Sequence, residues 1–201
     1  MRQTKKTVYI KFFVPINVKS IDELTRLVVA KLKERVERFV LLISSPGGNV
    51  AAGLSGYNFL KGIPAEVVTH NFGSADSIAT ILFCAGSERL CVPHARFLLH
   101  GIGFDIPSPT RFDEKILDER IKSLRIDREN ISRVIADTTG KSLGDVENDI
   151  LQGTPLNAEQ AREYGLVQEI RSELFERGAE VVEISARQGV AVRDMERGSR
   201  R

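Results

Sequence analysis

A five-residue apolar run, Phe39–Ile43, that ends at the turn sequence Ser44-Ser-Pro-Gly-Gly48 is the strongest constraint on how this chain folds. A continuous apolar run of this length is typical of a strand that is covered on both faces, as in parallel sheets. The next residues, Asn49–Leu60, return to helical spacing, and Pro64 closes this segment. A buried strand, a glycine turn and a helix in this order predict one unit of an α/β domain.

The same alternation of strand and helix continues over the first hundred residues. Val8–Ile16 is β-prone, and apolar residues at helical spacing follow within Glu23–Val36. A strand is predicted at Ala65–His70, before the loop Asn71–Asp76 and an apolar helix at 77–86. Such alternation implies parallel strands with crossover connections, so we expect an α/β fold. Two short strand-like runs come next, at 89–92 and 96–100.

A long charged segment, Asp113–Asp137, predicts one long helix. It carries a narrow apolar stripe at near-heptad spacing. A narrow stripe on a long helix usually packs against a partner, so we expect it to be buried against another subunit or the domain body. The stripe consists of Leu117, Ile121, Leu124, Ile131 and Ile135. Further helix starts are expected at Ser142 and Asn157, and further strands at 166–170 and 180–184.

Length and charge favour one domain with a basic tail. The chain has 201 residues, of which 42% are hydrophobic and 28% charged, so we expect a single domain over residues 1–184. The net charge is +2, but the last nine residues carry four arginines against one aspartate and one glutamate. The excess charge therefore lies in the tail 185–201, which we expect to be disordered. No clustered basic face indicates nucleic-acid binding.

Several classes of protein are excluded by what the sequence lacks. No stretch approaches the roughly 20 apolar residues of a membrane span, and the first residues lack the apolar core and cleavage site of a signal peptide. Two cysteines without a CxxC motif and three histidines give too few ligands for a zinc site. We therefore expect a cytoplasmic protein that has no metal or other cofactor and binds neither nucleic acid nor a membrane.

Three short segments carry residues with catalytic potential, and each has a structural alternative. The glycines of Ser45-Pro-Gly-Gly48 would let backbone N–H groups point outward, as an oxyanion hole requires, although most such turns are only turns. Ser77 stands at a helix start, where it would act as a nucleophile or cap the helix, as Asp76 also could. His100 ends a strand beside Gly101–Gly103, where it would act as a base or make only structural hydrogen bonds.

In their order along the chain these segments resemble the Clp protease proteolytic subunit, a serine peptidase of the ClpP/crotonase superfamily. The similarity runs from about residue 8 to residue 170 and is carried by several ordered motifs. These are Ile43–Val50, Gly73–Ala79, Arg96–His100, Thr139–Leu143 and Ala158–Leu166. The resemblance implies an α/β fold of repeated β-β-α units with a long handle helix, here about residues 113–137.

The resemblance also implies a site and an assembly. Ser77 would be the nucleophile and His100 the general base, while the backbone N–H groups of Gly48 and Ile78 would form the oxyanion hole. The implied reaction is endopeptidase cleavage of unfolded polypeptides or peptides through an acyl-enzyme. The implied assembly is a homo-oligomer of stacked rings with the handle helix between the rings.

The sequence departs from the family at the third catalytic position. Aligning the late helices places Gly153 where the family has the aspartate that orients the histidine. Asp149, Asp105 and Asn157 are the polar residues of the local sequence that could replace it, so the third triad member stays open. We expect weak or conditional peptidase activity, because loss of this aspartate lowers turnover in serine peptidases.

Two further departures concern partners. Only about seven residues precede Val8, so the axial loop of the family is nearly absent and docking to an AAA+ unfoldase is left open. Ile106–Thr110 brings two prolines into the segment that corresponds to the substrate-holding strand, which removes N–H donors. Two alternatives stay compatible with the sequence: a crotonase-like enzyme acting on acyl-CoA thioesters, and a catalytically weakened ring subunit.

Overall fold

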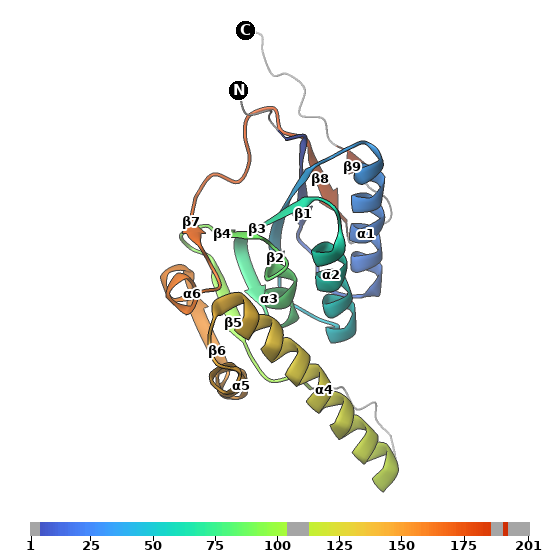
Figure 1. Cartoon of the computed structure of the whole chain (residues 1–201), viewed down its shortest axis with the longest axis vertical. Helices are drawn as coiled ribbons and strands as arrows, with labels where there is room; N and C mark the ends of the chain where they lie inside the picture. Colours follow the sequence, from blue (N-terminus) through green and yellow to red (C-terminus); the bar gives the residue numbers. More distant parts are fainter. Residues whose placement is uncertain (1–4, 104–112, 186–190, 193–201) are drawn as a thin grey trace.

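The computed structural model describes residues 5–103, 113–185 and 191–192. These residues form one nine-stranded sheet and the helices that pack on it (Figure 1). The strands are β1 (Thr7–Phe12), β2 (Arg38–Ser45), β3 (Glu66–Asp76), β4 (Glu88–Cys91), β5 (Arg96–Leu99), β6 (Thr154–Asn157), β7 (Glu169–Ile170), β8 (Val181–Ile184) and β9 (Ala191–Val192). The helices are α1 (Val18–Lys33), α2 (Val50–Gly62), α3 (Ile78–Phe83), α4 (Glu114–Thr139), α5 (Leu143–Gln152) and α6 (Ala158–Tyr164). The strand order is β6-β5-β3-β2-β1-β8-β9, and β4 pairs with β3 and β7.

Strand β2 confirms the prediction made from the apolar run. It pairs in parallel with β1 on one side and with β3 on the other. Phe39, Leu41 and Ile43 belong to the main core, whereas Val40 and Leu42 pack in a second cluster. Because alternate side chains of a strand point to opposite faces of a sheet, β2 is covered on both faces.

Helices α1, α2 and α3 all contribute to the main core. Helix α1 begins at Val18 rather than Glu23, because Asn17 forms a capping box with Ser20. Gly53 of α2 faces α3, and a Cβ atom at this position would lie 2.2 Å from Cγ1 of Ile78. The missing side chain therefore lets α2 approach α3 closely, at the first residue of the helix.

Strand β3 is longer than predicted, because it changes partners along its length. Its first part pairs with β4 as far as Asn71, and its last part, Ser74–Asp76, pairs with β5. Between the two parts the Asn71 side chain donates a hydrogen bond to the Arg96 carbonyl and accepts one from the Gly73 N–H. The segment expected to be a loop is therefore strand, since side-chain hydrogen bonds carry it past the change of partner.

Helix α4 is the predicted long helix, and it projects away from the body of the domain (Figure 1). Ile131 and Ile135 at its C-terminal end are buried in the main core. Leu124 is half-buried, and the side chains of Leu117 and Ile121 are 42% and 44% exposed in the single chain. The apolar stripe is thus buried by the domain body in its second half only.

The C-terminal elements follow the capping signals of the sequence. Ser142 caps α5 and Asn157 caps α6, as predicted, and strand β6 joins these two helices. In the tail expected to be disordered, β9 pairs antiparallel with β8. That expectation therefore does not apply to Ala191 and Val192, and the remaining tail residues, 186–190 and 193–201, lie outside the described residues.

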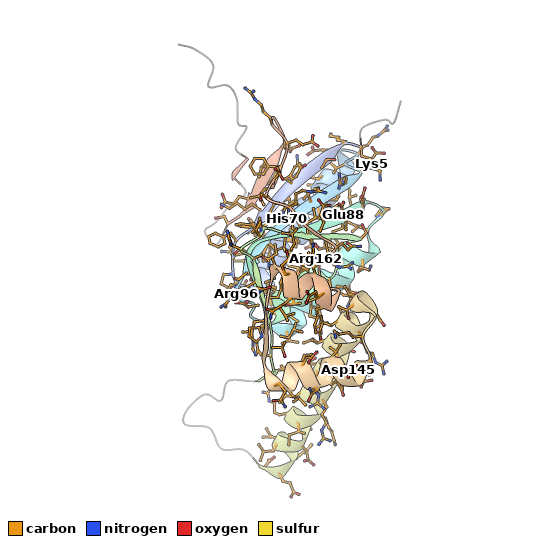
Figure 2. The ribbon with its side chains drawn as sticks, turned by 90° about the vertical axis from the view of Figure 1, so that its left-hand side faces the viewer. Lys5, His70, Glu88, Arg96, Asp145 and Arg162 are labelled. Carbon is orange, nitrogen blue, oxygen red and sulfur yellow. The ribbon has the colours of Figure 1, made fainter. Side chains whose placement is uncertain are left out.

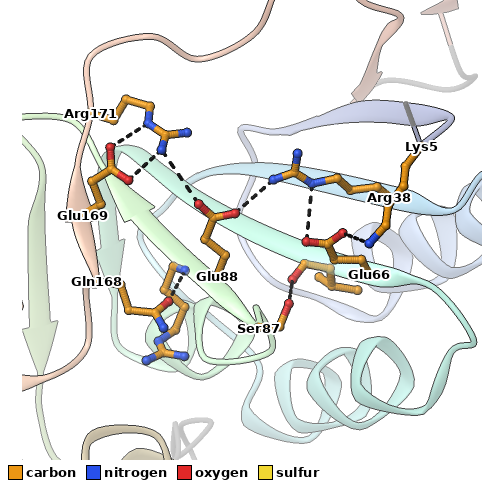
Figure 3. Close-up of polar contacts among 10 residues, drawn as sticks. Lys5, Arg38, Glu66, Ser87, Glu88, Gln168, Glu169 and Arg171 are labelled. Atoms are coloured by element: carbon orange, nitrogen blue, oxygen red, sulfur yellow. Dashed lines mark hydrogen bonds and ion pairs between the residues drawn. The ribbon is translucent and has the colours of Figure 1, made fainter. Parts of the chain in front are cut away.

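A chain of charged side chains links four strands at the end of β3 that is remote from α3 (Figure 3). Glu88 on β4 lies 2.9 Å from Arg38 on β2 and 3.8 Å from Arg171, which follows β7. Arg38 also lies 3.6 Å from Glu66 on β3, and Arg171 lies 2.6 Å from Glu169 on β7. Because these side chains are partly exposed, the individual ion pairs contribute little to stability.

Candidate active site

Ser77 lies at the junction of β3 and α3 in a strained backbone conformation. Its φ of 58° and ψ of −130° fall in a region that residues with a Cβ atom rarely adopt. The Ser77 N–H donates to the Leu98 carbonyl at 2.8 Å, and the Ser77 carbonyl accepts from the Thr80 N–H at 3.0 Å. The side chain makes no capping hydrogen bond, although Ser77 occupies the N-cap position of α3. Capping therefore does not account for this serine.

The glycine turn after β2 packs directly against Ser77. A Cβ atom on Gly47 would lie 2.7 Å from the Asp76 carbonyl oxygen and 2.8 Å from the Ser77 Cβ. Gly48 has a φ of 143°, and a Cβ atom there would lie 2.2 Å from the Ile16 carbonyl oxygen. Neither position has room for a side chain, so the backbone of the turn packs directly beside Ser77.

The N–H groups expected to form the oxyanion hole have no backbone partner among the described residues. On either side of Gly48, the Gly47 carbonyl accepts from the Ile16 N–H and the Asn49 N–H donates to the Ile16 carbonyl. The Gly48 N–H between them makes no such bond, and neither does the N–H of Ile78 at the start of α3. Unpaired backbone N–H groups beside a serine are what a developing oxyanion needs.

His100 follows β5 and is exposed. Its Nδ1 lies 2.8 Å from the carbonyl oxygen of Gly101. Since a carbonyl oxygen only accepts hydrogen bonds, this contact requires the proton on Nδ1 of the neutral ring. The lone pair of Nε2 is then available to accept a proton, as a general base must.

One cavity of about 160 Å³ brings these groups together. Ser77, His100, Gly48 and Ile78 all line it. The rest of its wall is mainly aliphatic and includes side chains from α4 and α5, namely Ile131, Ile135 and Ile150. The fold thus gathers all four predicted groups in one small cavity.

Comparison with known proteins identifies the family. The family model described as Clp protease matches residues 2–173. The chain belongs to the Clp protease family. It is 32% identical over 134 residues to ATP-dependent Clp protease proteolytic subunit 3 of Synechococcus sp. (strain CC9605), and 34% identical over 129 residues to ATP-dependent Clp protease proteolytic subunit of Ostreococcus tauri.

The extent of these matches is partial. The Synechococcus match covers 66% of this chain and 66% of the relative, and the Ostreococcus match covers 63% and 62%, so the chain spans just under two thirds of each relative. Among solved structures, a ClpP1 mutant from Listeria monocytogenes is similar, with a TM-score of 0.74 and 23% identity. That likeness covers 84% of this chain and 92% of the Listeria chain, and it shows that the Clp protease fold is shared.

The sheet register relates Gly153, the position expected for a third catalytic residue, to His100. Strands β5 and β6 are antiparallel, with Leu99 opposite Thr154. Continuing this register by one residue places Gly153 opposite His100. Gly153 ends α5 with a φ of 74°, and within the described part of the chain no heavy atom other than those of its chain neighbours lies within 4 Å of where its Cβ would stand. The position beside the histidine is therefore open and offers no carboxylate.

Two of the three candidate replacements have other partners. Asp149 accepts a 2.7 Å hydrogen bond from the Tyr164 hydroxyl. The pKa of Tyr164 is raised, mainly by burial and then by this hydrogen bond. The Asn157 side chain accepts from the Gln160 N–H at 2.9 Å and so caps α6. Asp105 lies outside the described residues. Within the part of the chain that the structure describes, the Nδ1 partner of His100 is the Gly101 carbonyl.

Sequence reasoning missed the charged pair next to the nucleophile position. Asp76, which was considered only as a possible helix cap, is nearly buried and forms an ion pair with Arg96 at the start of β5. The signal in the sequence was an aspartate at the end of an otherwise uncharged segment, Asn71–Ala75, directly before Ser77.

Other reactive groups of the described residues do not form a competing site. Cys84 and Cys91 are free and buried, and burial raises the pKa of each thiol to about 11, so both are protonated at neutral pH. Across residues 5–103 and 113–185, no group of three or more His, Cys, Asp and Glu side chains is placed to hold a metal ion. No helix of the described part combines the length and the apolar character that crossing a membrane requires.

Proposed function

We propose that this Clp protease family member is a serine peptidase subunit in which Ser77 is the nucleophile and His100 the general base. The observation that carries the proposal is the single cavity that holds a strained serine without a capping bond, the glycine turn, and a histidine whose Nε2 has no hydrogen-bond partner among the described residues. The family membership favours this function over an acyl-CoA enzyme of crotonase type. The proposal includes the cytoplasmic location that the sequence led us to expect.

Each step of the proposed reaction uses a group in this cavity. Ser77 Oγ attacks the carbonyl carbon of the scissile peptide bond, and His100 Nε2 takes its proton. The N–H groups of Gly48 and Ile78 stabilise the negative oxygen of the tetrahedral intermediate. His100 then gives the proton to the leaving amine, which breaks the C–N bond and leaves an acyl-enzyme. Water, deprotonated by His100, attacks the ester and releases the acid and the free Ser77 hydroxyl.

We propose that the working form is a ring-shaped homo-oligomer. The exposed first half of the α4 stripe supports this, because exposed leucine and isoleucine side chains on a projecting helix favour association. A second copy that covers Leu117 and Ile121 would complete the burial begun by the domain body at Ile131 and Ile135. The names of the two relatives describe ATP-dependent proteases. For this chain we propose the peptidase reaction only, without a particular unfoldase partner.

A catalytically weakened ring subunit is the second candidate function. Gly153 favours it, because this position opposite His100 provides no group to orient the ring or stabilise its charged form. The two candidates share the fold and differ in whether Ser77 reacts.

Labelling with a fluorophosphonate probe separates the two candidates. We expect the wild-type protein to form a covalent adduct during long incubation, and Ser77→Ala to form none. The control is Ser55→Ala, which changes an exposed serine on α2 and should leave labelling unaltered. Equal labelling of Ser77→Ala and wild type would show that Ser77 is not the nucleophile. A wild-type protein without any adduct would favour the weakened subunit.

A further inference from the structure

The strands that carry Ser77 and His100 are joined by an ion pair that the reaction itself does not use. Asp76 ends β3 and precedes Ser77, and Arg96 begins β5, whose last residue precedes His100. A guanidinium nitrogen of Arg96 donates to Oδ2 of Asp76. The Asp76 side chain is 9% exposed and that of Arg96 is 65% exposed, at the outline of the molecule in Figure 2.

The backbone register shows what this pair fastens. In the parallel pairing of β3 and β5, Ser74 lies opposite Arg96 and Asp76 lies opposite Leu98. The Asp76–Arg96 contact therefore crosses the two strands diagonally, beside the bond from the Ser77 N–H to the Leu98 carbonyl. The Asn71 side chain holds the Arg96 carbonyl at 2.8 Å and ties the start of β5 to β3 a second time.

Stability alone does not account for the pair. Oδ1 of Asp76 is buried and has no hydrogen-bond partner among the described residues, so half of the carboxylate is desolvated without compensation. The partner cation is largely in solvent, where an ion pair stabilises a fold little. Replacing both members of such a pair by apolar side chains often leaves stability unchanged or raises it.

The strained backbone of Ser77 suggests what the Asp76–Arg96 ion pair does. A backbone in a sparsely populated region persists only where its surroundings fix it, and Ser77 has this conformation directly after Asp76. We propose that the Asp76–Arg96 pair is a positioning device that holds β3 and β5 in the register in which Ser77 and His100 share one cavity. This inference rests on the proposed function. Both residues act through the strands, because neither lines the cavity.

The test combines a structural and a chemical readout on the full-length protein. Arg96→Met removes the cation and leaves the buried Asp76 carboxylate without its ion-pair partner, whereas Arg96→Lys keeps the charge. The structural readout is hydrogen–deuterium exchange of the peptides that contain Ser77 and Leu98. The chemical readout is the rate of fluorophosphonate labelling. The matched control is Glu88→Gln, which removes cross-strand ion pairs to β2 and to the segment after β7, at the other end of β3 (Figure 3).

We expect Arg96→Met to speed exchange of the Ser77 peptide by about tenfold or more, since loss of a local constraint raises local opening. Labelling should slow by about tenfold or more, because small displacements at a reacting centre are costly. Arg96→Lys should recover most of both losses, and Glu88→Gln should change neither. Unchanged exchange in Arg96→Met would overturn the positioning role, whether or not Ser77 is reactive.

A second variant separates positioning from simple stabilisation. Asp76→Leu combined with Arg96→Met replaces the pair by apolar side chains, and we expect its unfolding temperature to stay near that of the wild type while labelling stays slow. Labelling at the wild-type rate in this variant would overturn the proposal. The two proposals can also fail separately. If the wild-type protein is never labelled, but the Ser77 peptide exchanges faster in Arg96→Met than in the wild type, the proposed peptidase function is refuted and the strand-positioning role is supported.

Discussion

The two sides of the candidate site differ in how firmly the rest of the molecule fixes them. On the nucleophile side, Gly47 and Gly48 have no room for a side chain, and Ser77 is strained and held by backbone bonds. On the base side, His100 is exposed, and among the described residues no heavy atom other than those of the chain neighbours lies within 4 Å of a Cβ added at Gly103 or Gly153. The proposed nucleophile and oxyanion groups are therefore held in place by the core, whereas the orientation of the histidine depends on few contacts within the described residues.

The largest effect should come from filling the open position on the base side. Gly153→Asp places a carboxylate opposite His100, and we expect peptide hydrolysis to rise by up to about 10⁴-fold if no other residue orients the ring. Aspartate tolerates the left-handed backbone at this position better than most residues, so folding should be little affected. The measurement is the initial rate on a small peptide substrate.

Gly153→Asn is the control for this variant, because it has the same shape without the negative charge. A gain in Gly153→Asp that Gly153→Asn lacks would confirm an incomplete triad. No gain in Gly153→Asp would contradict the idea that the base side lacks an orienting group.

The next largest effect should come from crowding the nucleophile side. Gly48→Ala brings a Cβ atom against the Ile16 carbonyl at a positive φ, so we expect a loss of about 3 kcal/mol, or roughly 10 °C in unfolding temperature. Labelling should fall by about 10² to 10³-fold, because the oxyanion donor moves. Gly103→Ala is the matched change on the base side. Similar losses in both variants would remove the difference between the two sides.

A third effect concerns assembly at the far end of α4. Leu124→Glu places a charge in the apolar stripe between its buried and exposed halves, and we expect the assembled mass to fall to that of smaller species in light scattering. Glu119→Gln is the control, since this exposed side chain lies outside the stripe. An unchanged mass in Leu124→Glu would contradict the handle role of α4. Loss of labelling with loss of assembly would show that the base side is completed by a neighbouring copy.

The smallest effect is expected in the core behind the nucleophile. Burial raises the pKa of the Cys84 thiol to about 11, so iodoacetamide should modify the folded protein very slowly at pH 7 to 8. The ordinary thiol pKa is about 9, so between about pH 9 and 11 the unfolded chain loses a proton that the folded chain keeps, and stability falls as the pH rises through this window. Rapid alkylation at pH 7.5, read by mass spectrometry, would show that the α3 side is not rigid.

The sequence predicted the parts of this molecule that local patterns determine. The apolar run at Phe39–Ile43 marks a buried strand by itself, and the caps Ser142 and Asn157 mark helix starts by their side-chain chemistry. The start of α1 was placed too late because the apolar stripe was used instead of the cap Asn17. Strand β6 was missed because Thr154–Asn157 has no strand pattern and is ordered by pairing with β5.

The site was predicted as a set of residues but not as a geometry. The places of Ser77 and His100 followed from local context and from the family resemblance. The strained backbone of Ser77 could not be predicted from the sequence, because it depends on close packing against Gly47 at the end of another strand. The composition of the second half of β3 predicts a loop, because Asn, Gly, Ser and Asp are common in turns, whereas in the structure the Asn71 side chain donates a hydrogen bond to the backbone of β5.

The position of the fluorophosphonate adduct decides whether Ser77 is the nucleophile. The wild-type protein would be labelled, digested and sequenced by tandem mass spectrometry, with Gly153→Asp in parallel to raise the yield. We expect one adduct, on Ser77, formed faster in Gly153→Asp than in the wild type. An adduct on a different residue, or none in either protein, would contradict the claim that the core of this fold preorganises Ser77 as a nucleophile.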